Sequence, residues 1–151
     1  MTVAERLAEM GLELHGYQPA AQYVGAVRTG NLVYTSGAGP ALPGGGFVQG
    51  KVGGDLDVEQ GVEAAKLCAI SLLSALQGEI GDLEKVVRIV KLLGFVNSAP
   101  GFTQQPAVMD GASNLLISLF GEKGRHARSA VGMAELPFNI AVEVEMVVQV
   151  D

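Results

Sequence analysis

The sequence has no tryptophan, one cysteine and few charged side chains. A single cysteine excludes a disulfide within the chain, and Cys68 lies at helical spacing from Ala65, Ala69 and Leu72, which predicts a small core residue rather than a nucleophile. Charged residues make up 17% of the chain, against roughly a quarter in ordinary domains, while 48% of residues are hydrophobic. This surplus predicts that some apolar surface is buried between subunits.

Long apolar runs and a basic excess are also missing. No run approaches the roughly eighteen residues of a membrane span, and the first residues lack the layout of a signal peptide, so we expect a soluble, cytoplasmic protein without a membrane partner. The net charge of -6 and the pI near 4.9 disfavour nucleic acid as a partner, because sequence-independent binding needs clustered Lys and Arg. Only Arg125, His126 and Arg128 cluster, which fits a pocket better than a groove.

The length of 151 residues fits one globular domain, predicted at residues 23–151, preceded by a helix and arm at residues 1–22. Thr2 and Glu5 form a capping-box pattern, which predicts a short helix that ends at Gly11. In the arm that follows, the apolar residues show neither helical nor strand spacing. The arm carries His15, and a lone histidine without a second candidate ligand nearby is predicted as a surface residue rather than part of a metal site.

The remaining pattern predicts two strand-helix-strand halves. The expected elements are a hairpin of Tyr23–Val27 and Leu32–Thr35, a helix of about five turns from Asp57 that ends near Gly78 and Gly81, a strand at Val86–Val96, a helix from Pro106 to Gly121, and a terminal hairpin whose strands begin near Ala127 and Val142. We expect an α+β fold in which two helices cover one face of a mixed sheet. The uncovered face would then be buried by assembly.

The predicted terminal hairpin carries the best candidate chemical groups. Arg128 can grip a carboxylate bidentately if it points into a cleft, and Glu143 and Glu145 share one strand face because side chains alternate. A glutamate buried on such a strand would have a raised pKa and could handle a proton near neutral pH. A surface arginine and solvated glutamates are the alternatives, and the facing of Arg128 relative to Glu143 depends on a register that the sequence leaves open.

Other catalytic arrangements lack their signatures. Ser129 has no G-x-S-x-G context, and no histidine, cysteine or acid completes a triad or metal set with these glutamates, so we expect neither covalent nor metal-dependent hydrolysis. The glycine-rich stretch from Gly44 to Gly54 lacks the context of a nucleotide phosphate loop. Asp110, in the second turn of its predicted helix, is interpreted from the pattern alone as a solvated acid.

Two motifs near the ends of the predicted domain resemble those of a known family. They are Tyr23-Val24 followed by Gly30-Asn31-Leu32-Val33-Tyr34-Thr35-Ser36-Gly37, and Ala127-Arg128-Ser129-Ala130-Val131 followed by Leu136-Pro137 and Val142-Glu143-Val144-Glu145. Together they resemble the signatures of the RidA (YjgF) family of enamine/imine deaminases. The resemblance implies a chorismate-mutase-like fold and a homotrimer with ligand clefts between subunits.

The resemblance also implies roles for individual residues. Family members hydrolyse 2-aminoacrylate and related 2-imino acids to 2-keto acids and ammonia without a cofactor. By resemblance, Arg128 would clamp the substrate carboxylate, Glu143 would position or activate water, and Tyr23 would close the cleft. The backbone around Gly37 and Ala130 would hold the reacting end.

The chain departs from the family at three places. Ala130 stands where many deaminating members carry cysteine, and Asp110 lies about where they often have asparagine, which adds a negative charge if it faces the cleft. The N-terminal extension indicates a longer branch of the family.

Four functions are therefore considered. The leading hypothesis is deamination of 2-imino acids at clefts between subunits, and the alternative is a non-catalytic binder of small carboxylates on the same trimeric scaffold. RNA cleavage, an activity of some family members, fits the acidic charge poorly. A mutase is ranked last, because only Arg28, Arg125 and Arg128 are available as anion ligands.

Overall fold

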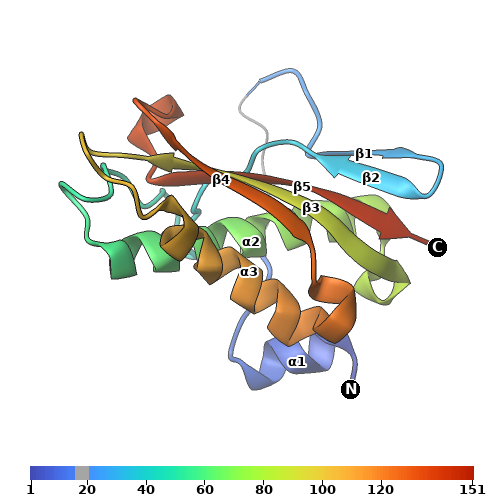
Figure 1. Ribbon diagram of the computed structural model, residues 1–151. Coiled ribbons are helices and arrows are strands. Elements are labelled where there is room, and N and C mark those ends of the chain that lie inside the picture. Colours follow the sequence, from blue (N-terminus) through green and yellow to red (C-terminus); the bar gives the residue numbers. More distant parts are fainter. Residues whose placement is uncertain (16–20) are drawn as a thin grey trace.

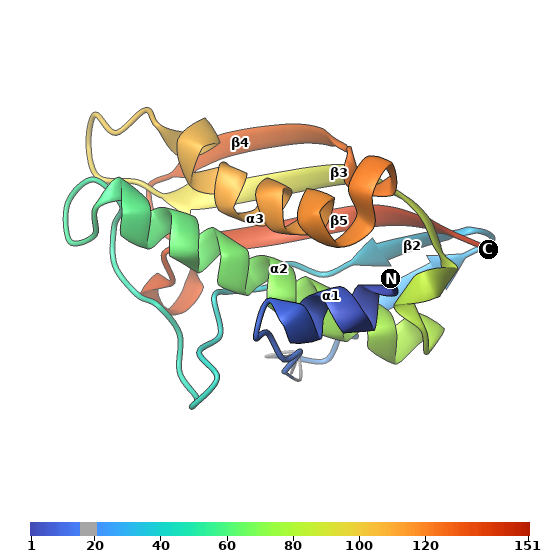
Figure 2. The same ribbon diagram turned by 90° about the horizontal axis from the view of Figure 1, so that it is seen from below.

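A five-stranded mixed sheet carries helices on one of its two faces (Figure 1). The computed structural model describes residues 1–15 and 21–151. The main elements are α1 (Val3–Glu9), β1 (Ala26–Thr29), β2 (Leu32–Thr35), α2 (Val58–Ile80), β3 (Val86–Asn97), α3 (Gln105–Phe120), β4 (Ala127–Met133) and β5 (Val142–Val150), with 3-10 turns η1 (Leu83–Lys85), η2 (Gly121–Gly124) and η3 (Pro137–Asn139). Figure 2 shows α2 and α3 side by side across the sheet, with α1 on their outer side. This arrangement confirms the predicted fold class.

The sheet order is β1-β2-β5-β3-β4, so the predicted terminal hairpin is wrong. β3 lies between β4 and β5, pairing in parallel with β4 and antiparallel with β5. Strands adjacent in sequence usually pair, but residues 134–141 form a connection long enough to cross the end of β3 instead of making a tight turn. The apolar β3 thereby becomes an interior strand.

The register decides which side chains share a face. Arg128 and Met146 lie opposite Leu92, whose side chain is buried beneath the helices. Glu143 lies opposite Phe95, three residues further along β3, and therefore projects from the open face. Glu145 also lies on the open face, as predicted for the pair of glutamates. Arg128 and Glu143 of one chain thus point to opposite sides of the sheet.

Local sequence signals set the helix ends. The predicted capping box at Thr2 is present, since its side chain accepts from Glu5 N, and a second one forms at Asp57, whose side chain accepts from Gln60 N, with the reciprocal bonds also made. α2 runs through Gly78 and ends before Gly81, which caps it at φ 82°, so the helix is longer than the predicted five turns. β1 begins later than predicted, at Ala26.

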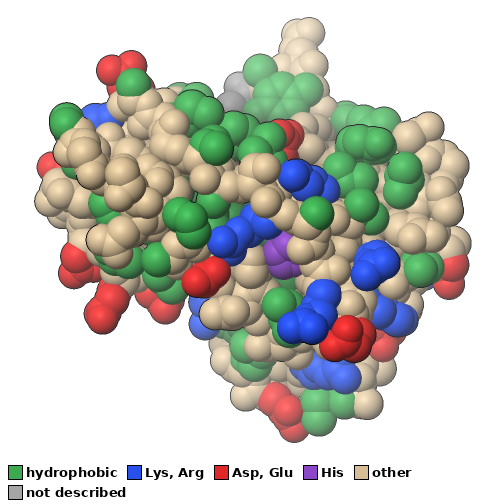
Figure 3. All heavy atoms as spheres, in the orientation of Figure 1, with side chains coloured by type: hydrophobic (Ala, Val, Ile, Leu, Met, Phe, Trp, Pro, Cys, Tyr) green, Lys and Arg blue, Asp and Glu red, His purple; other side chains and the backbone are tan. Residues whose placement is uncertain are grey.

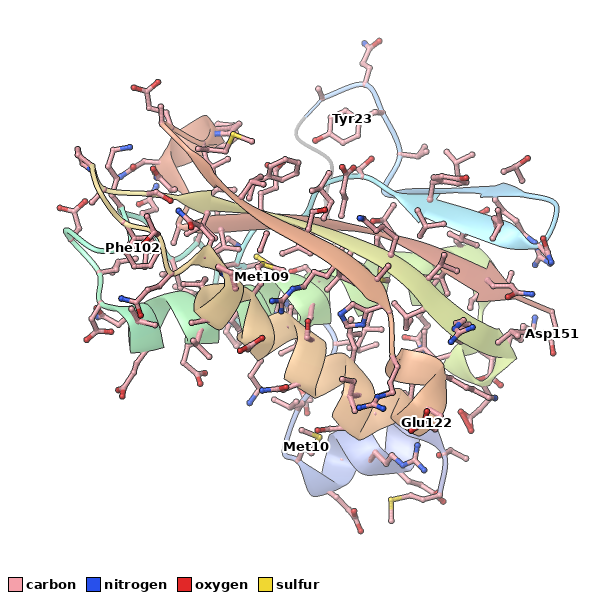
Figure 4. All side chains as sticks on the ribbon, viewed as in Figure 1. Met10, Tyr23, Phe102, Met109, Glu122 and Asp151 are labelled. Carbon is pink, nitrogen blue, oxygen red and sulfur yellow. The ribbon has the colours of Figure 1, made fainter. Side chains whose placement is uncertain are left out.

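Two glycines let the layers approach closely. Gly111 on α3 lies against the backbone carbonyl of Val62 on α2, where a Cβ would collide with the oxygen. Gly94 on β3 leaves room for the Met109 side chain, which Figure 4 shows between α3 and the sheet. The packing distances of helix to helix and helix to sheet therefore depend on these positions.

The open face of the sheet and its edges carry apolar side chains that no helix or strand of the described residues covers. Val27, Tyr34 and Val131 are exposed there. None of the helices in residues 1–15 and 21–151 combines the length and apolarity needed to cross a membrane. Burial of the open face against other copies of the chain stays a prediction.

We predict that Gly111→Ala lowers the free energy of unfolding by about 1–3 kcal/mol, because the new methyl group overpacks the contact between α2 and α3. Gly78→Ala is the matched control: it lies exposed inside α2 with no atom near the added Cβ, so it should stabilise by about 0.5–1 kcal/mol through helix propensity. Urea denaturation followed by circular dichroism measures both. Equal effects of the two substitutions would contradict the packing argument.

Candidate functional site

A cavity of about 610 Å³ lies where β5 begins. Tyr23, Gly37 and Glu143, three of the residues singled out from the sequence, line it together. Its other walls come from the loop at residues 39–47, from η3 and from the N-terminal arm. The structure therefore brings half of the predicted site residues to one place.

Glu143 is the only acidic residue, and no Lys or Arg occurs, among the described residues that line this cavity. Its side chain packs on the Gly37 backbone so closely that a Cβ at Gly37 would stand 2.6 Å from the Glu143 Oε2 atom. Partial burial raises the pKa of the Glu143 carboxyl above its ordinary value, and the nearby Glu145 raises it further. Gly37 thus allows a proton-exchanging group to lie against the chain at the cavity wall.

Exposed aromatic side chains surround the cavity. Tyr23, Phe47 and Phe138 all line it while remaining exposed to solvent, and Figure 4 shows Tyr23 on the side of the sheet away from the helices. Phe138 has φ 58°, which is rare for a bulky side chain. A hydrogen bond of 2.7 Å from Gln49 Nε2 to the Phe138 carbonyl fixes this strained turn. The wall formed by η3 is therefore held by contacts outside the turn itself.

Arg128 forms a second group on the helix-covered face of β4. Its Nη1 donates to Asp110 Oδ1 at 2.9 Å and to Ser113 Oγ at 3.1 Å, and its Nη2 donates to the Pro106 carbonyl at 3.2 Å. Asp110 is solvent-exposed, as expected from the sequence, and it is also the ion-pair partner of Arg128. Figure 3 shows acidic, basic and histidine side chains gathered over this part of the surface.

His126 is connected to Arg128 through the Ser113 hydroxyl group. The His126 Nδ1 lies 2.7 Å from the Gly124 carbonyl, and its Nε2 lies 2.9 Å from Ser113 Oγ. Since a carbonyl only accepts, Nδ1 carries the proton and Nε2 accepts from Ser113, whose oxygen in turn accepts from Arg128. Burial lowers the pKa of the His126 ring, which favours this neutral form. Arg128 is thus oriented by a chain of fully paired groups.

Part of the guanidinium stays uncommitted. An arginine has five N–H donors, and Arg128 uses two on Nη1 and one on Nη2. Within residues 1–15 and 21–151, its Nε–H and the second Nη2–H have no acceptor. Two donors are enough to hold a carboxylate bidentately.

The two groups do not meet within one chain. Arg128, Asp110 and Ala130 belong to the face and edge next to α3, because Ala130 lies opposite Gly94 on the same side as Arg128. Tyr23, Gly37 and Glu143 belong to the cavity on the other side. The register question that the sequence left open is answered: the candidate anion clamp and the candidate base face away from each other.

The sequence contained signals for some of the residues that it did not single out. Ser113 follows Asp110 by three residues on α3, and His126 precedes Arg128 by two, so helical and strand periods place all four on facing surfaces. His15 was predicted to be a surface residue, which is wrong: it lines the cavity and its Nε2 is buried. Ser71, also at the cavity, had no sequence signal beyond its place on an apolar helix.

Cys68 is confirmed as a core residue. It is fully buried, its thiol donates to the Val142 carbonyl at 3.4 Å, and burial raises the pKa of the thiol well above its ordinary value. A buried, protonated thiol is a poor nucleophile. In the part of the chain that the structure describes, no cluster of three histidine, cysteine or acidic residues is placed to hold a metal ion.

Comparison with known proteins gives matches over nearly the whole chain. A sequence model of the family described as "YjgF/chorismate_mutase-like, putative endoribonuclease" matches residues 4–150. Protein TCP17 of Trypanosoma cruzi is 46% identical over 151 residues, covering 99% of this chain and 94% of TCP17. The crystal structure of Atu1372 from Agrobacterium tumefaciens, a protein of unknown function, is 46% identical with a TM-score of 0.92, covering 99% of this chain and 94% of that one.

A third match covers the full length of the matched protein. The crystal structure described as a "putative endoribonuclease" from Shewanella oneidensis is 31% identical with a TM-score of 0.95, covering 99% of this chain and 100% of that one. The resemblance seen in the two sequence motifs is therefore confirmed. The chain belongs to the YjgF/chorismate-mutase-like family.

Proposed function

We propose that the protein hydrolyses 2-imino acids and their enamine tautomers to 2-keto acids and ammonia at clefts formed between copies of the chain. The observation that carries this proposal is Glu143, a half-buried carboxyl with a raised pKa that lines an open cavity. The uncommitted N–H donors of Arg128 supply the second requirement, a clamp for the substrate carboxylate.

Arg128 would bind and orient the substrate. Its Nε–H and remaining Nη2–H would donate to the two carboxylate oxygens, while Asp110, Ser113 and the Pro106 carbonyl hold the other side of the guanidinium. A clamp that is already fixed loses little side-chain entropy when substrate binds. The imine carbon next to the carboxylate would thereby be held in one place.

Glu143 would move the proton. Its carboxylate takes a proton from water as the water oxygen bonds to the imine carbon, and it passes this proton to nitrogen, which gives a carbinolamine. It then takes the proton of the new hydroxyl group and passes it to the same nitrogen as the carbon–nitrogen bond breaks and the carbonyl forms. The products are a 2-keto acid and ammonia, with no net change at Glu143. A raised pKa suits this role, because the carboxyl can both accept and release a proton near neutral pH.

The two groups would come from different chains. Arg128 and Glu143 project from opposite faces of one sheet, so a single cleft that contains both needs Arg128 from one copy and Glu143 from another. Arg128 lies on the edge strand β4, where a second copy can approach. We propose a homotrimer with three such clefts, in which the apolar open faces are buried together.

RNA cleavage, the activity in the family description, finds less support in this chain. The net charge is -6, and Arg128, the best-placed cation, is paired with Asp110. The side chain at the cavity that can act as an acid or base is also negatively charged when ionised, which repels phosphates. RNA is therefore a comparison substrate in the experiments below.

We predict that the parent protein accelerates keto-acid formation from freshly generated 2-iminopropanoate, and that Arg128→Ala and Glu143→Gln each lower kcat/KM by about a hundredfold or more. Co-expressing the two variants in equal amounts should restore about a quarter of the parent activity, because random mixing in a trimer leaves about one cleft in four with both residues. Light scattering of the same samples checks the trimeric mass.

Three results would contradict this proposal. Activity in the parent without recovery in the mixed sample would mean that each cleft takes Arg128 and Glu143 from the same chain. Binding of 2-ketobutyrate, lost in Arg128→Ala, without turnover of any imine would identify a non-catalytic carboxylate binder. Cleavage of RNA that survives Arg128→Ala would assign a different site.

We predict that kcat/KM falls at low pH as Glu143 becomes protonated, with an apparent pKa above the ordinary glutamate value. Glu145→Gln should shift this acid limb to lower pH, because it removes a negative charge that raises the pKa of Glu143. Glu79→Gln, exposed near the end of α2, should leave the limb in place. Initial rates from pH 4 to 8 measure the shift, and an unchanged limb in Glu145→Gln would argue against Glu143 as the base.

We predict that Asp110→Asn tightens binding of 2-ketobutyrate by about two- to fivefold, because it keeps a hydrogen-bonding oxygen for Arg128 while removing a competing charge. Asp110→Ala, which removes both, should bind less tightly than Asp110→Asn. Isothermal titration calorimetry gives the dissociation constants. Weaker binding in Asp110→Asn than in the parent would show that the ion pair is needed to position Arg128.

A further inference from the structure

The cavity beside Glu143 continues past the level of the sheet to the helix layer. Ser71, in the middle of α2, and His15, in the N-terminal arm, line the same cavity as Glu143 and Tyr23. Figure 1 shows that α1 and α2 lie on one side of the sheet and that the chain after the arm reaches the other side. The cavity therefore has an inner part that the proposed deamination step does not use.

Ser71 has a buried hydroxyl without a partner. The residue is 2% exposed, and its Oγ makes no hydrogen bond. A serine inside a helix ordinarily bonds to the carbonyl one turn earlier, which Ser71 does not do. Leaving a buried hydroxyl unpaired costs free energy, so a polar group on α2 at the cavity wall indicates a place for a ligand atom.

His15 is the second unpaired polar group. Its Nε2 is buried and has no hydrogen-bond partner. Ser71 and His15 are the two residues with such atoms in the described part of the chain, and both line this one cavity. Two independent elements, α2 and the arm, thus each contribute a residue with an unpaired buried polar atom to the lining of the same cavity.

The rest of the lining limits what the inner part can hold. The walls are largely apolar, with Leu42, Phe47, Phe138 and Ile140 among them, and no Lys or Arg of the described residues lines the cavity. A carboxylate in the inner part would meet no cation. An ammonium group would be drawn to Glu143 and occupy the carboxyl that the reaction needs. An uncharged hydrogen-bonding group at the end of an apolar chain satisfies both conditions.

We propose that Ser71 and His15 form a specificity subsite that binds a terminal hydroxyl or carboxamide on the side chain of the substrate. The assignment of the substrate as a 2-imino acid rests on the proposed function, but the subsite itself rests on the cavity and its two unpaired groups. The substrates would then be 2-imino acids with an uncharged polar tip, rather than the smallest members of the class.

Binding of stable 2-oxo acids tests the subsite without any turnover. The probes are 4-hydroxy-2-oxobutanoate, 5-hydroxy-2-oxopentanoate and 6-hydroxy-2-oxohexanoate, each compared by calorimetry with the acid in which a methyl group replaces the hydroxyl. The hydroxy acid of fitting length should bind the parent about 3- to 10-fold more tightly than its methyl partner. This preference should disappear in Ser71→Ala and shrink in His15→Phe, while pyruvate binding stays unchanged.

Two controls separate the subsite from a structural role. Ser118→Ala, exposed on α3, should keep the preference. Ser71→Ala should unfold at the same temperature as the parent or higher, because it removes a buried group that has no partner.

The outcomes distinguish the two proposals. Equal binding of every hydroxy acid and its methyl partner, or a preference that persists in Ser71→Ala, would overturn the subsite while leaving deamination of 2-iminopropanoate intact. A preference that depends on Ser71, in a protein that turns over no imine, would overturn the proposed reaction and support the subsite. Failure of all of these acids to bind would overturn the subsite as well.

Discussion

The pairing of β3 with both β4 and β5 is the constraint on which the arrangement of functional groups depends. It separates two strands that follow each other in sequence and gives β5 an antiparallel partner on each side. The register that results turns Arg128 toward α3 and Glu143 toward the opposite face. A single chain therefore holds Arg128 and Glu143 apart, so the proposed reaction requires association of copies.

Three groups at the cavity are held in states that cost the fold some stability. Glu143 lies partly buried with no Lys or Arg among the described residues that line the cavity, Phe138 occupies a backbone conformation that bulky residues avoid, and the Ser71 hydroxyl is unpaired. All three line the same cavity. Arg128 differs from these groups, because Asp110, Ser113 and the Pro106 carbonyl hold one side of its guanidinium in a fixed network. The unfavourable conformations and unpaired groups thus lie at the cavity, whereas the Arg128 side chain is held in place. Local departures from folding rules of this kind are typical of functional sites.

Much of the fold could be predicted because local rules determine it. Both capping boxes, the ends of α2 and α3 at Gly81 and Gly121, and the double-sided strand β3 follow from side-chain chemistry within a few residues. The strand order could not be predicted in this way, because the connection at residues 134–141 permits either a hairpin or a crossing, and only packing of the whole sheet selects one. The same limit applied to the site: residue types at Arg128 and Glu143 were visible, but their facing depended on pairing with β3. His15 was predicted wrongly because its burial comes from distant parts of the chain.

The central place of β5 also has a consequence for how the chain is made. β5 lies between β2 and β3, so a strand that follows the other four in sequence joins segments that are synthesised before it. Until β5 arrives, the β1-β2 hairpin has no neighbour in the sheet and the apolar edge of β3 stays open. Before β5 is synthesised, the chain therefore has unpaired strand edges. Unpaired edges of this kind favour aggregation, and chaperones protect partly folded chains from it.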